Sequence, residues 1–289
     1  AEAANGSGGC VNGAAKSSGD GSRRGVVRLC APGDGDFYEG YFADGAPHGW
    51  GKCQFANGDV YEGEWAQGIR HGSGRLAYKR GGSYAGEWRD GVPHGAGRFE
   101  SANGDVYEGK VAAGMREGEG TQRLVSGERY TGYWARDQRS GRGSWRSADG
   151  LESYTGSWRE GERHGAGVCR WRRSFGAAEQ TYDGEWQAGK RHGRGRALFD
   201  SGDVFEGEWM NGRRNGWGEL RSANGDMYRG KWVGDVRCGE GTYTAADRSC
   251  VYTGQWASDV RHGSGRGASA GGDVYVGEWR DGEQHGDGQ

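Results

Sequence analysis

Apolar and polar positions alternate along most of the chain in short stretches that are typical of β-strands. In the stretch YEGEW at residues 61–65, the two rings and the glycine between them fall on one side of an extended strand, and the two glutamates fall on the other. A turn signal follows, as at Asp90-Gly91, and the chain returns through a Gly-x-Gly segment as a second strand. The pattern predicts a β-hairpin with one aromatic face.

This hairpin pattern recurs eleven times. The aromatic residues that open the repeats are Tyr38, Tyr61, Tyr84, Tyr107, Tyr130, Tyr154, Tyr182, Phe205, Tyr228, Tyr252 and Tyr275. Gly follows two, eleven and thirteen residues later in every repeat, and Trp follows four residues later in nine of them. Such a fixed period indicates a repeat architecture in which each hairpin packs on its neighbours.

The composition supports a sheet held together by aromatic side chains. The 63 glycines and 33% hydrophobic content leave few aliphatic residues, whereas 13 Trp and 14 Tyr supply apolar surface. Because a lone hairpin is marginally stable, we expect an all-β fold: an elongated, single-layer antiparallel sheet of about eleven tandem hairpins over residues 38–289. Its 22 strands would span roughly 100 Å. The glycines eleven and thirteen residues after each opening aromatic are both expected to share the ring face and to leave flat backbone on which rings lie.

The repeats resemble a known family. The segments YEGEWAQGIRHGSG, YAGEWRDGVPHGAG, YDGEWQAGKRHGRG and YVGEWRDGEQHGDG are similar to MORN repeats (membrane occupation and recognition nexus), and the resemblance covers residues 38–289. It implies a grooved binding sheet without catalysis of its own. MORN arrays occur in ciliary radial spokes, parasite cytoskeletons and junctional membrane proteins, and as appendages of lipid kinases or a methyltransferase, so the resemblance leaves the function open.

Some positions depart from this pattern. Val111 stands in place of the Trp in the fourth repeat, five extra residues lengthen the link before Tyr182, and Asp replaces the turn Gly at three positions. These aspartates are Asp137, Asp235 and Asp259.

Segments outside the array and the cysteines give weaker signals. Residues 1–24, rich in Gly, Ser and Ala, are predicted to be disordered, and residues 25–37 to form a partial repeat or cap. No membrane span or secretory signal is predicted, and six cysteines without metal or disulfide spacing suit a reducing compartment, so we expect a cytoplasmic protein. A net charge of −2 argues against nucleic-acid binding.

Three kinds of residue could carry chemistry, but none predicts a catalytic or metal site. The seven histidines all stand ten residues after an opening aromatic, and adjacent copies would lie roughly 9.5 Å apart, too far to share a metal. Only Cys238 beside His262, at a dimer contact, remains a pair to check. The segment 267–271, Gly-Ala-Ser-Ala-Gly, matches a nucleophile elbow, but it is expected to enter a hairpin turn instead of a helix. We therefore predict no enzyme, no metal and no cofactor.

A row of arginines, the Arg row, stands nine residues after eight of the opening aromatics. It consists of Arg70, Arg116, Arg139, Arg163, Arg191, Arg214, Arg237 and Arg261. The turns at the other ends of the strands carry an Asp row, namely Asp59, Asp105, Asp203, Asp226 and Asp273. The sheet is therefore expected to have a basic edge, which either binds an acidic protein or anionic lipid or consists of ordinary turn residues.

The second strands carry variable apolar residues, the groove residues, on the predicted aromatic face. These are Phe55, Tyr78, Phe99, Leu124, Trp145, Trp171, Phe199, Leu220 and Tyr243. They either cover the sheet or form a surface that a partner helix or extended segment occupies.

The function predicted from the sequence is a non-enzymatic scaffold that docks a partner protein along this groove. The expected setting is a ciliary, flagellar or other cytoskeletal assembly such as the axoneme, and a homodimer is a further option. One alternative is a membrane-tethering module that binds anionic phospholipid. Another is the regulatory array of a larger enzyme.

Overall fold

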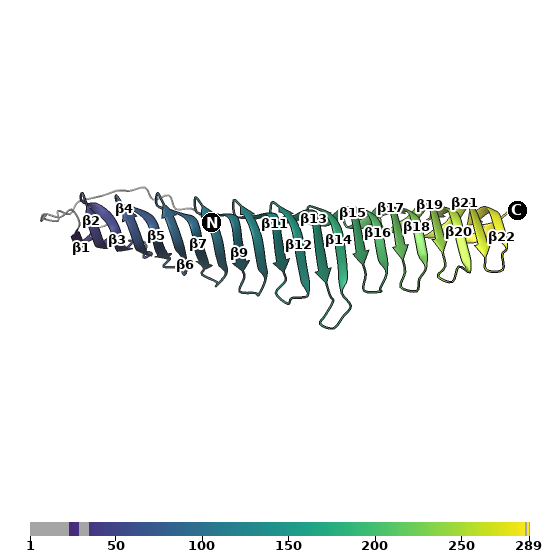
Figure 1. Ribbon diagram of the computed structural model, residues 1–289, viewed down its shortest axis with the longest axis horizontal. Coiled ribbons are helices and arrows are strands. Elements are labelled where there is room, and N and C mark those ends of the chain that lie inside the picture. The colour runs from purple at the N-terminus through teal and green to yellow at the C-terminus, as the bar shows by residue number, and fades with distance from the viewer. Residues whose placement is uncertain (1–22, 29–34, 287, 289) are drawn as a thin grey trace. The chain divides into compact units, whose positions relative to one another are not determined.

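The computed structural model describes residues 23–28, 35–286 and 288, which divide into two units, residues 1–138 and 139–289. Within each unit the strands lie side by side in one layer, each antiparallel to the next (Figure 1). The first unit holds β1 (Arg23–Arg28), β2 (Phe37–Ala43), β3 (Ala46–Gln54), β4 (Val60–Ala66), β5 (Ile69–Ala77), β6 (Gly82–Arg89), β7 (Val92–Ser101), β8 (Val106–Ala112), β9 (Met115–Arg123) and β10 (Arg129–Ala135).

The second unit continues the same pattern. It holds β11 (Gln138–Arg146), β12 (Glu152–Arg159), β13 (Glu162–Trp171), β14 (Gln180–Gln187), β15 (Lys190–Leu198), β16 (Val204–Met210), β17 (Arg213–Arg221), β18 (Met227–Val233), β19 (Val236–Thr244), β20 (Cys250–Ala257), β21 (Val260–Ser269), β22 (Val274–Arg280) and β23 (Glu283–His285). The predicted all-β, single-layer antiparallel fold is confirmed, and the described residues contain no helix. The predicted length stays a prediction.

The first unit begins before the first repeat. Strand β1 pairs antiparallel with β2, from Arg23 opposite Phe42 to Arg28 opposite Phe37. It covers the start of the segment expected to form a cap, residues 25–37, whose remainder lies partly outside the described residues. The disorder predicted for residues 1–24 concerns a segment outside the described residues except for the last two, which begin β1.

A two-residue turn closes each hairpin, and both of its residues have positive φ. In the third repeat Asp90 has φ 51° and Gly91 has φ 80°, and Arg89 pairs with Val92 across the turn. This is the type I′ geometry, whose twist matches that of the flanking strands. Gly, or Asp, at the second turn position therefore follows from the backbone conformation.

A β-bulge follows the turn and separates the two glycines that the sequence pattern had placed on one face. Pairing moves from Gly86 opposite Gly97 to Trp88 opposite Pro93, so the second strand carries extra residues. One of them, Gly95, has φ 67°, and a Cβ there would meet the carboxylate of Glu87. The expectation that the glycine eleven residues after the opening aromatic seats a ring is wrong, because the bulge turns it to the opposite face.

The glycines two and thirteen residues after the opening aromatic do seat its ring. In the third repeat Gly86 and Gly97 face each other, and a Cβ on either would overlap the Tyr84 side chain. The Tyr84 hydroxyl donates to the carbonyl of Glu87 at 2.9 Å. The Tyr84 side chain is buried, and desolvation raises its pKa to about 12. The pair of glycines thus allows a single-layer sheet to bury an aromatic ring.

Tryptophans join one repeat to the next. Trp88 packs edge-on against the Tyr61 ring of the preceding repeat and the Tyr84 ring of its own, at centroid distances of 5.1 and 5.2 Å. Its indole nitrogen donates to the carbonyl of Gly74 in the preceding repeat at 3.0 Å. Each such aromatic pair contributes roughly 0.5–1.5 kcal/mol beyond area burial. The core of each unit is therefore a ladder of alternating Tyr and Trp rings.

Candidate partner-binding site

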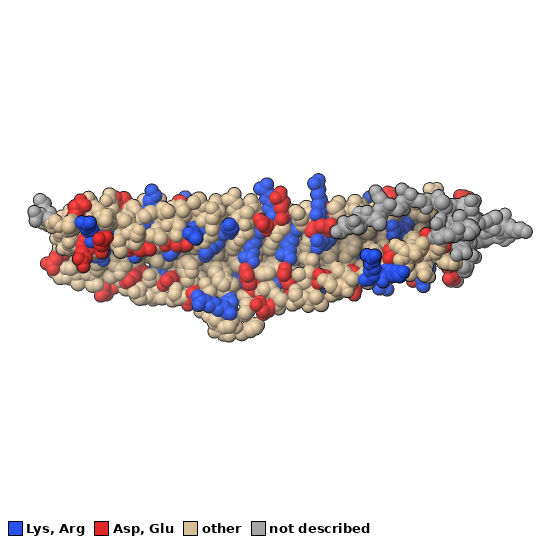
Figure 2. Space-filling view, turned by 180° about the vertical axis from the view of Figure 1, so that it is seen from behind, with Lys and Arg blue, Asp and Glu red and all other residues tan. Residues whose placement is uncertain are grey.

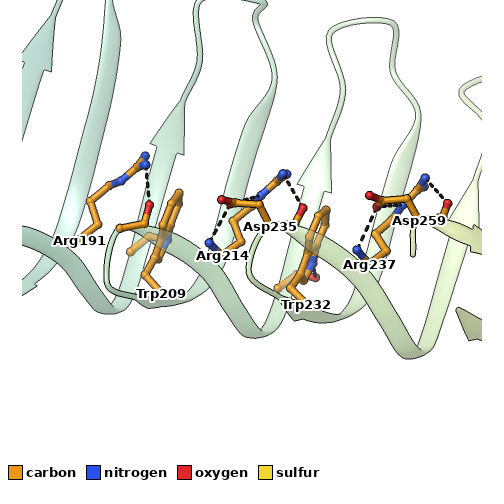
Figure 3. Close-up of polar contacts among 10 residues, drawn as sticks. Arg191, Trp209, Arg214, Trp232, Asp235, Arg237 and Asp259 are labelled. Atoms are coloured by element: carbon orange, nitrogen blue, oxygen red, sulfur yellow. Dashed lines mark hydrogen bonds and ion pairs between the residues drawn. The ribbon is translucent and has the colours of Figure 1, made fainter. Parts of the chain in front are cut away.

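The Arg row lies over this ring ladder. The guanidinium carbon of Arg191 is 4.2 Å from the ring centroid of Trp209 in the next repeat, and Nη2 donates to the carbonyl of Gly212 at 2.7 Å (Figure 3). Arg70 repeats this arrangement with Trp88 and Gly91. Burial lowers the pKa of both guanidinium groups. These arginines therefore connect adjacent repeats.

Three arginines of the row also pair with the aspartates that replace the turn glycine. Arg214 Nε lies 3.1 Å from Asp235 Oδ1, and its Nη2 donates to the Asp235 carbonyl at 3.0 Å (Figure 3). Arg237 binds Asp259 in the same way, and Arg116 binds Asp137. The departures noted in the sequence thus supply an acceptor for the arginine of the preceding repeat.

At the edge that was expected to be basic, the arginine side chains are consequently already bound to other residues of the protein. The side chains of Arg116, Arg214 and Arg237 are only 20–26% exposed, and their guanidinium groups already hold aromatic and acidic partners. On the face seen in Figure 2, Lys and Arg side chains lie among Asp and Glu side chains. Binding of an acidic surface by the Arg row stays a prediction and would need these partners to be exchanged.

The Asp row also links repeats, at the opposite ends of the strands. Asp59 Oδ1 accepts a hydrogen bond from the backbone N–H of Lys79 in the next link at 2.9 Å, and Asp105 accepts one from Val125 at 2.8 Å. Hydrogen bonds from the Val125 N–H and from Asn103 lower the pKa of Asp105. The acidic turns therefore stabilise the stacking of hairpins.

The glutamate three residues after the opening aromatic has a role that the sequence analysis missed. Glu87 Oε1 accepts a hydrogen bond from the N–H of Ala96 in the bulge at 3.0 Å, and Glu185 does the same for Arg194 at 3.0 Å. The available signal was the eight-residue spacing between this glutamate and the bulge glycine, which recurs in the five repeats that have Glu at this position. Alternation alone assigns it only to the solvent side.

The groove residues lie on the face of the ring ladder, as their spacing predicts, and several contact it. Eight are half-buried and Tyr78 is 39% exposed. Phe99 packs between Tyr84 and Tyr107 at centroid distances of 4.5 and 6.4 Å, and the Tyr243 hydroxyl donates to Asp226 at 2.8 Å. Phe55, Tyr78, Phe99 and Leu124 belong to the first unit, and Trp145, Trp171, Phe199, Leu220 and Tyr243 belong to the second. Their role in partner binding stays a prediction.

A pocket of about 610 Å³ opens on this face in the second unit, beside the lengthened link of the sixth repeat. Leu151, Cys169, Trp171 and Trp186 supply its apolar lining. Trp186 and Cys169 are buried, whereas Trp171 is half-buried at the end of β13. Among the groove residues, Trp171 is the one that lines this pocket.

Arg163 is one of the polar residues that line the pocket, and it differs from Arg191 in its contacts. Its Nη2 pairs with Glu152 Oε1 at 2.5 Å and its Nη1 donates to Cys169 Sγ at 3.3 Å. The guanidinium carbon lies 5.2 and 5.3 Å from the ring centroids of Trp145 and Trp186. Burial raises the pKa of the Cys169 thiol to about 12, so this thiol is a packing group and not a nucleophile.

The lengthened link forms a loop beside the pocket. Arg172 and Arg173 of this loop line the pocket, where Arg172 pairs with Glu179 at 2.9 Å and Arg173 pairs with Asp200 at 2.6 Å. Phe175 is 77% exposed. The sequence analysis noted the five extra residues of this link, but it did not show that the link borders a pocket.

The remaining candidates for chemistry have structural explanations. Ser269 ends β21 and enters a turn, where its hydroxyl lies 3.3 Å from Asp273 Oδ2, so the segment 267–271 lacks the strand-to-helix geometry of a nucleophile elbow. The histidines, His48, His71, His94, His164, His192, His262 and His285, lie in or beside the bulges. Among the described residues no three acidic, His or Cys side chains cluster as metal ligands, and the pair Cys238 and His262 belongs to no such cluster.

In the part of the chain that the structure describes, no helix has the length and apolar character needed to cross a membrane.

Comparisons with known proteins agree with the architecture. The family model described as MORN repeat matches eleven segments, residues 38–60, 61–83, 84–106, 107–129, 130–152, 154–173, 182–204, 205–227, 228–250, 252–267 and 275–289. No protein of curated function matches the sequence.

Solved structures match this chain only at low similarity. One is the TCP domain of Drosophila melanogaster SAS-4 in complex with a proline-rich motif of Ana2, at 13% identity and a TM-score of 0.32, covering 53% of this chain and 80% of that one. Another is the TCP10 domain of Danio rerio CPAP in complex with a STIL peptide, at 12% identity and a TM-score of 0.34, covering 73% and 97%. These scores are too low to assign the partners of either protein to this chain.

Proposed function

Because the chain belongs to the MORN repeat family, which its eleven matched segments establish, we propose that it is a non-enzymatic scaffold that docks a partner protein. The partner is a helix or extended segment that lies along the groove residues. The setting proposed for this scaffold is a ciliary, flagellar or other cytoskeletal assembly, as the family resemblance implies.

The pocket at the sixth and seventh repeats is the observation that carries the proposal. The ring ladder itself is closed, since Tyr154 and Trp186 are buried and their rings pack against each other. The pocket instead leaves Trp171 half-buried on the same face. A large aromatic side chain in a concave apolar site is a typical anchor position of protein interfaces. This surface is accordingly the best candidate for a docked segment.

The engaged Arg row favours protein docking over membrane tethering. A lipid surface would have to compete with Trp209 and Gly212 for Arg191, and with Asp235 for Arg214. A segment on the groove residues leaves all of these contacts intact. Membrane tethering is therefore an outcome to be tested and not the proposed function.

The test is affinity purification of the tagged full chain from cells that express it, compared with the Trp171→Ser variant. The variant should lose its co-purifying partner while its circular dichroism and thermal unfolding stay those of the unaltered chain. Trp217→Ser is the matched control, because Trp217 is 54% exposed on the opposite face of the same unit. The control should retain the partner.

Two results would contradict the proposal. If both variants keep the same partners, the groove residues only cover the sheet. If the chain floats with vesicles containing phosphatidylserine, ignores tubulin polymers and loses vesicle binding on Arg70→Glu and Arg261→Glu substitution, the membrane-tethering alternative is correct.

A further inference from the structure

The geometry points to the chemistry of the docked partner: the pocket and loop of the sixth repeat bind an acidic peptide segment that carries an apolar anchor residue. This inference rests on the proposed docking function and specifies its ligand. It follows from three features, namely the apolar lining, the charges on the rim and the loop that supplies them.

The pocket can bury one large apolar side chain. Leu151, Trp171 and Trp186 line it, and a site of about 610 Å³ falls in the size range of pockets that enclose a small ligand or one anchor side chain. The guanidinium group of Arg163 in the pocket lining already has partners, because it pairs with Glu152 and donates a hydrogen bond to Cys169. An incoming apolar side chain therefore leaves no buried charge without a partner.

Basic side chains outnumber acidic ones around the pocket. Its lining includes the basic side chains of Arg163, Arg172, Arg173, Lys190 and Arg191, and the acidic side chains of Asp149 and Glu152.

Ion pairs to Glu152, Glu179 and Asp200 engage three of these five basic side chains, namely Arg163, Arg172 and Arg173. Within the described residues they leave Lys190 and Arg191 without an acidic partner. Lys190 is exposed and, within the described residues, makes no ion pair. Arg173 is 75% exposed although it contacts Asp200, so a partner carboxylate can reach it from solvent. Charge complementarity thus selects a partner with several carboxylates next to its anchor residue.

The loop makes this site unlike the other repeats. Five extra residues precede Tyr182, and the lengthened link places Arg172 and Arg173 in the pocket lining, while Phe175 of the same loop is 77% exposed. An exposed ring on a loop next to basic side chains is a second contact point for an amphipathic segment. A repeat of ordinary length has no residues to form such a flank.

The test measures binding of two fluorescein-labelled peptides to the full chain by fluorescence anisotropy. One peptide alternates Glu with Leu and has a central Trp, and the other has Lys in place of every Glu. The acidic peptide should bind and the basic one should not, and binding should weaken severalfold between low and physiological salt.

Variants then locate the binding site. Arg172→Glu, Arg173→Glu and Lys190→Glu together should weaken binding of the acidic peptide by about tenfold or more, because each exposed charge contact contributes little by itself. Trp171→Ser alone should weaken it to a similar degree. Arg194→Glu with Arg196→Glu, on the opposite face of the seventh repeat, is the matched control and should bind as the unaltered chain does.

The outcomes separate this inference from the docking function. If Trp171→Ser loses the native partner but the acidic peptide does not bind, the array is a scaffold and the inferred acidic chemistry is wrong. If the control variant loses peptide binding equally, the peptide responds to the net charge of the protein and not to this pocket, and the inference is wrong. If the unaltered chain binds phosphatidylserine vesicles but not the acidic peptide, and the triple variant loses vesicle binding, the loop binds a membrane surface and the inference is wrong.

Discussion

Two junctions between neighbouring repeats show how the array is held together. Between the seventh and eighth repeats, Arg191 lies 4.2 Å from the ring centroid of Trp209 and donates to the carbonyl of Gly212. Between the third and fourth repeats, Pro93 stands at the arginine position and Val111 stands at the tryptophan position. Both side-chain partners are absent from the second junction.

The backbone contact is the same at both junctions. The Gly212 N–H donates to the Arg191 carbonyl at 2.9 Å, and the Gly114 N–H donates to the Pro93 carbonyl at 2.9 Å. At the second junction Phe99 replaces the missing indole as the contact between consecutive tyrosine rings. The hydrogen bond across the junction therefore depends on the turn, whereas the stacking depends on whichever side chain fills the space.

The comparison shows that the arginine occurs only where the next repeat has its tryptophan, whereas the tryptophan also occurs without the arginine. All eight arginines of the row precede a repeat that has its Trp. The reverse does not hold, because Trp65 is present although Pro47 occupies the arginine position before it. A guanidinium group needs the ring and the turn carbonyl to offset its partial burial. The Trp65 indole keeps its tyrosine contacts and its hydrogen bond to the Gly51 carbonyl without an arginine.

Alkaline pH should separate the two junctions most strongly. Burial raises the pKa of Tyr84 and of Tyr107 to about 12, so these phenols stabilise the fold fully below pH 10 and lose that stabilisation as pH rises from 10 to about 12. The junction of repeats seven and eight has only one such phenol, Tyr182, whose pKa burial also raises, because Phe205 on the other side of Trp209 cannot ionise. Hydrogen exchange should show the junction of repeats three and four opening at lower pH, and Tyr84→Phe with Tyr107→Phe should delay it. Simultaneous opening of both junctions would contradict this.

Trp209→Ala should be the most damaging single substitution in the comparison. Trp209 is 3% exposed, packs on Tyr182 and Phe205, and bonds the Gly195 carbonyl. Its loss should cost about 3–5 kcal/mol in the local free energy of opening. Val111→Ala is the counterpart at the other junction and should cost roughly 1–2 kcal/mol. Native-state hydrogen exchange measures both, and equal costs would remove the distinction between the junctions.

Arg191→Ala should have an intermediate effect. It removes a cation–π contact and a charged hydrogen bond, together about 1–3 kcal/mol at a partly buried site. Arg191→Lys should recover only part of this, because an ammonium group cannot both stack on Trp209 and reach the Gly212 carbonyl in the same way. Local exchange rates in repeats seven and eight report the loss. Full recovery by lysine would mean that only the charge matters.

Asp235→Asn should have the smallest effect. The Arg214–Asp235 pair is half-exposed at the carboxylate, so its charge contributes about 0.5–1 kcal/mol, and Asn tolerates the positive φ of this position. The difference between variant and unaltered chain should vanish at high salt. If the loss of local stability persists at high salt, the pair stabilises the junction through hydrogen-bond geometry and not through charge.

The features that could be predicted from the sequence are those that recur in all eleven repeats. Offsets that recur in every repeat predicted the hairpins, the turn positions, the ring face and Gly97 as a ring seat, but they did not identify Gly86 as the second seat. The groove residues were placed on the correct face by the same alternation. The pocket was not predicted, since it depends on the single lengthened link that has no second copy to compare.

The sequence by itself determined that the chain is an array of antiparallel hairpins, because alternation, turn residues and period all agree. Only the tertiary structure decided the roles of Gly95, Glu87 and the Arg row. The β-bulge shifts the phase of the second strand, so Gly95 leaves the ring face and meets Glu87. The arginine side chain reaches into the next repeat, so it stacks on a ring instead of lining an open edge. Both outcomes depend on contacts between strands, which one-dimensional spacing does not contain.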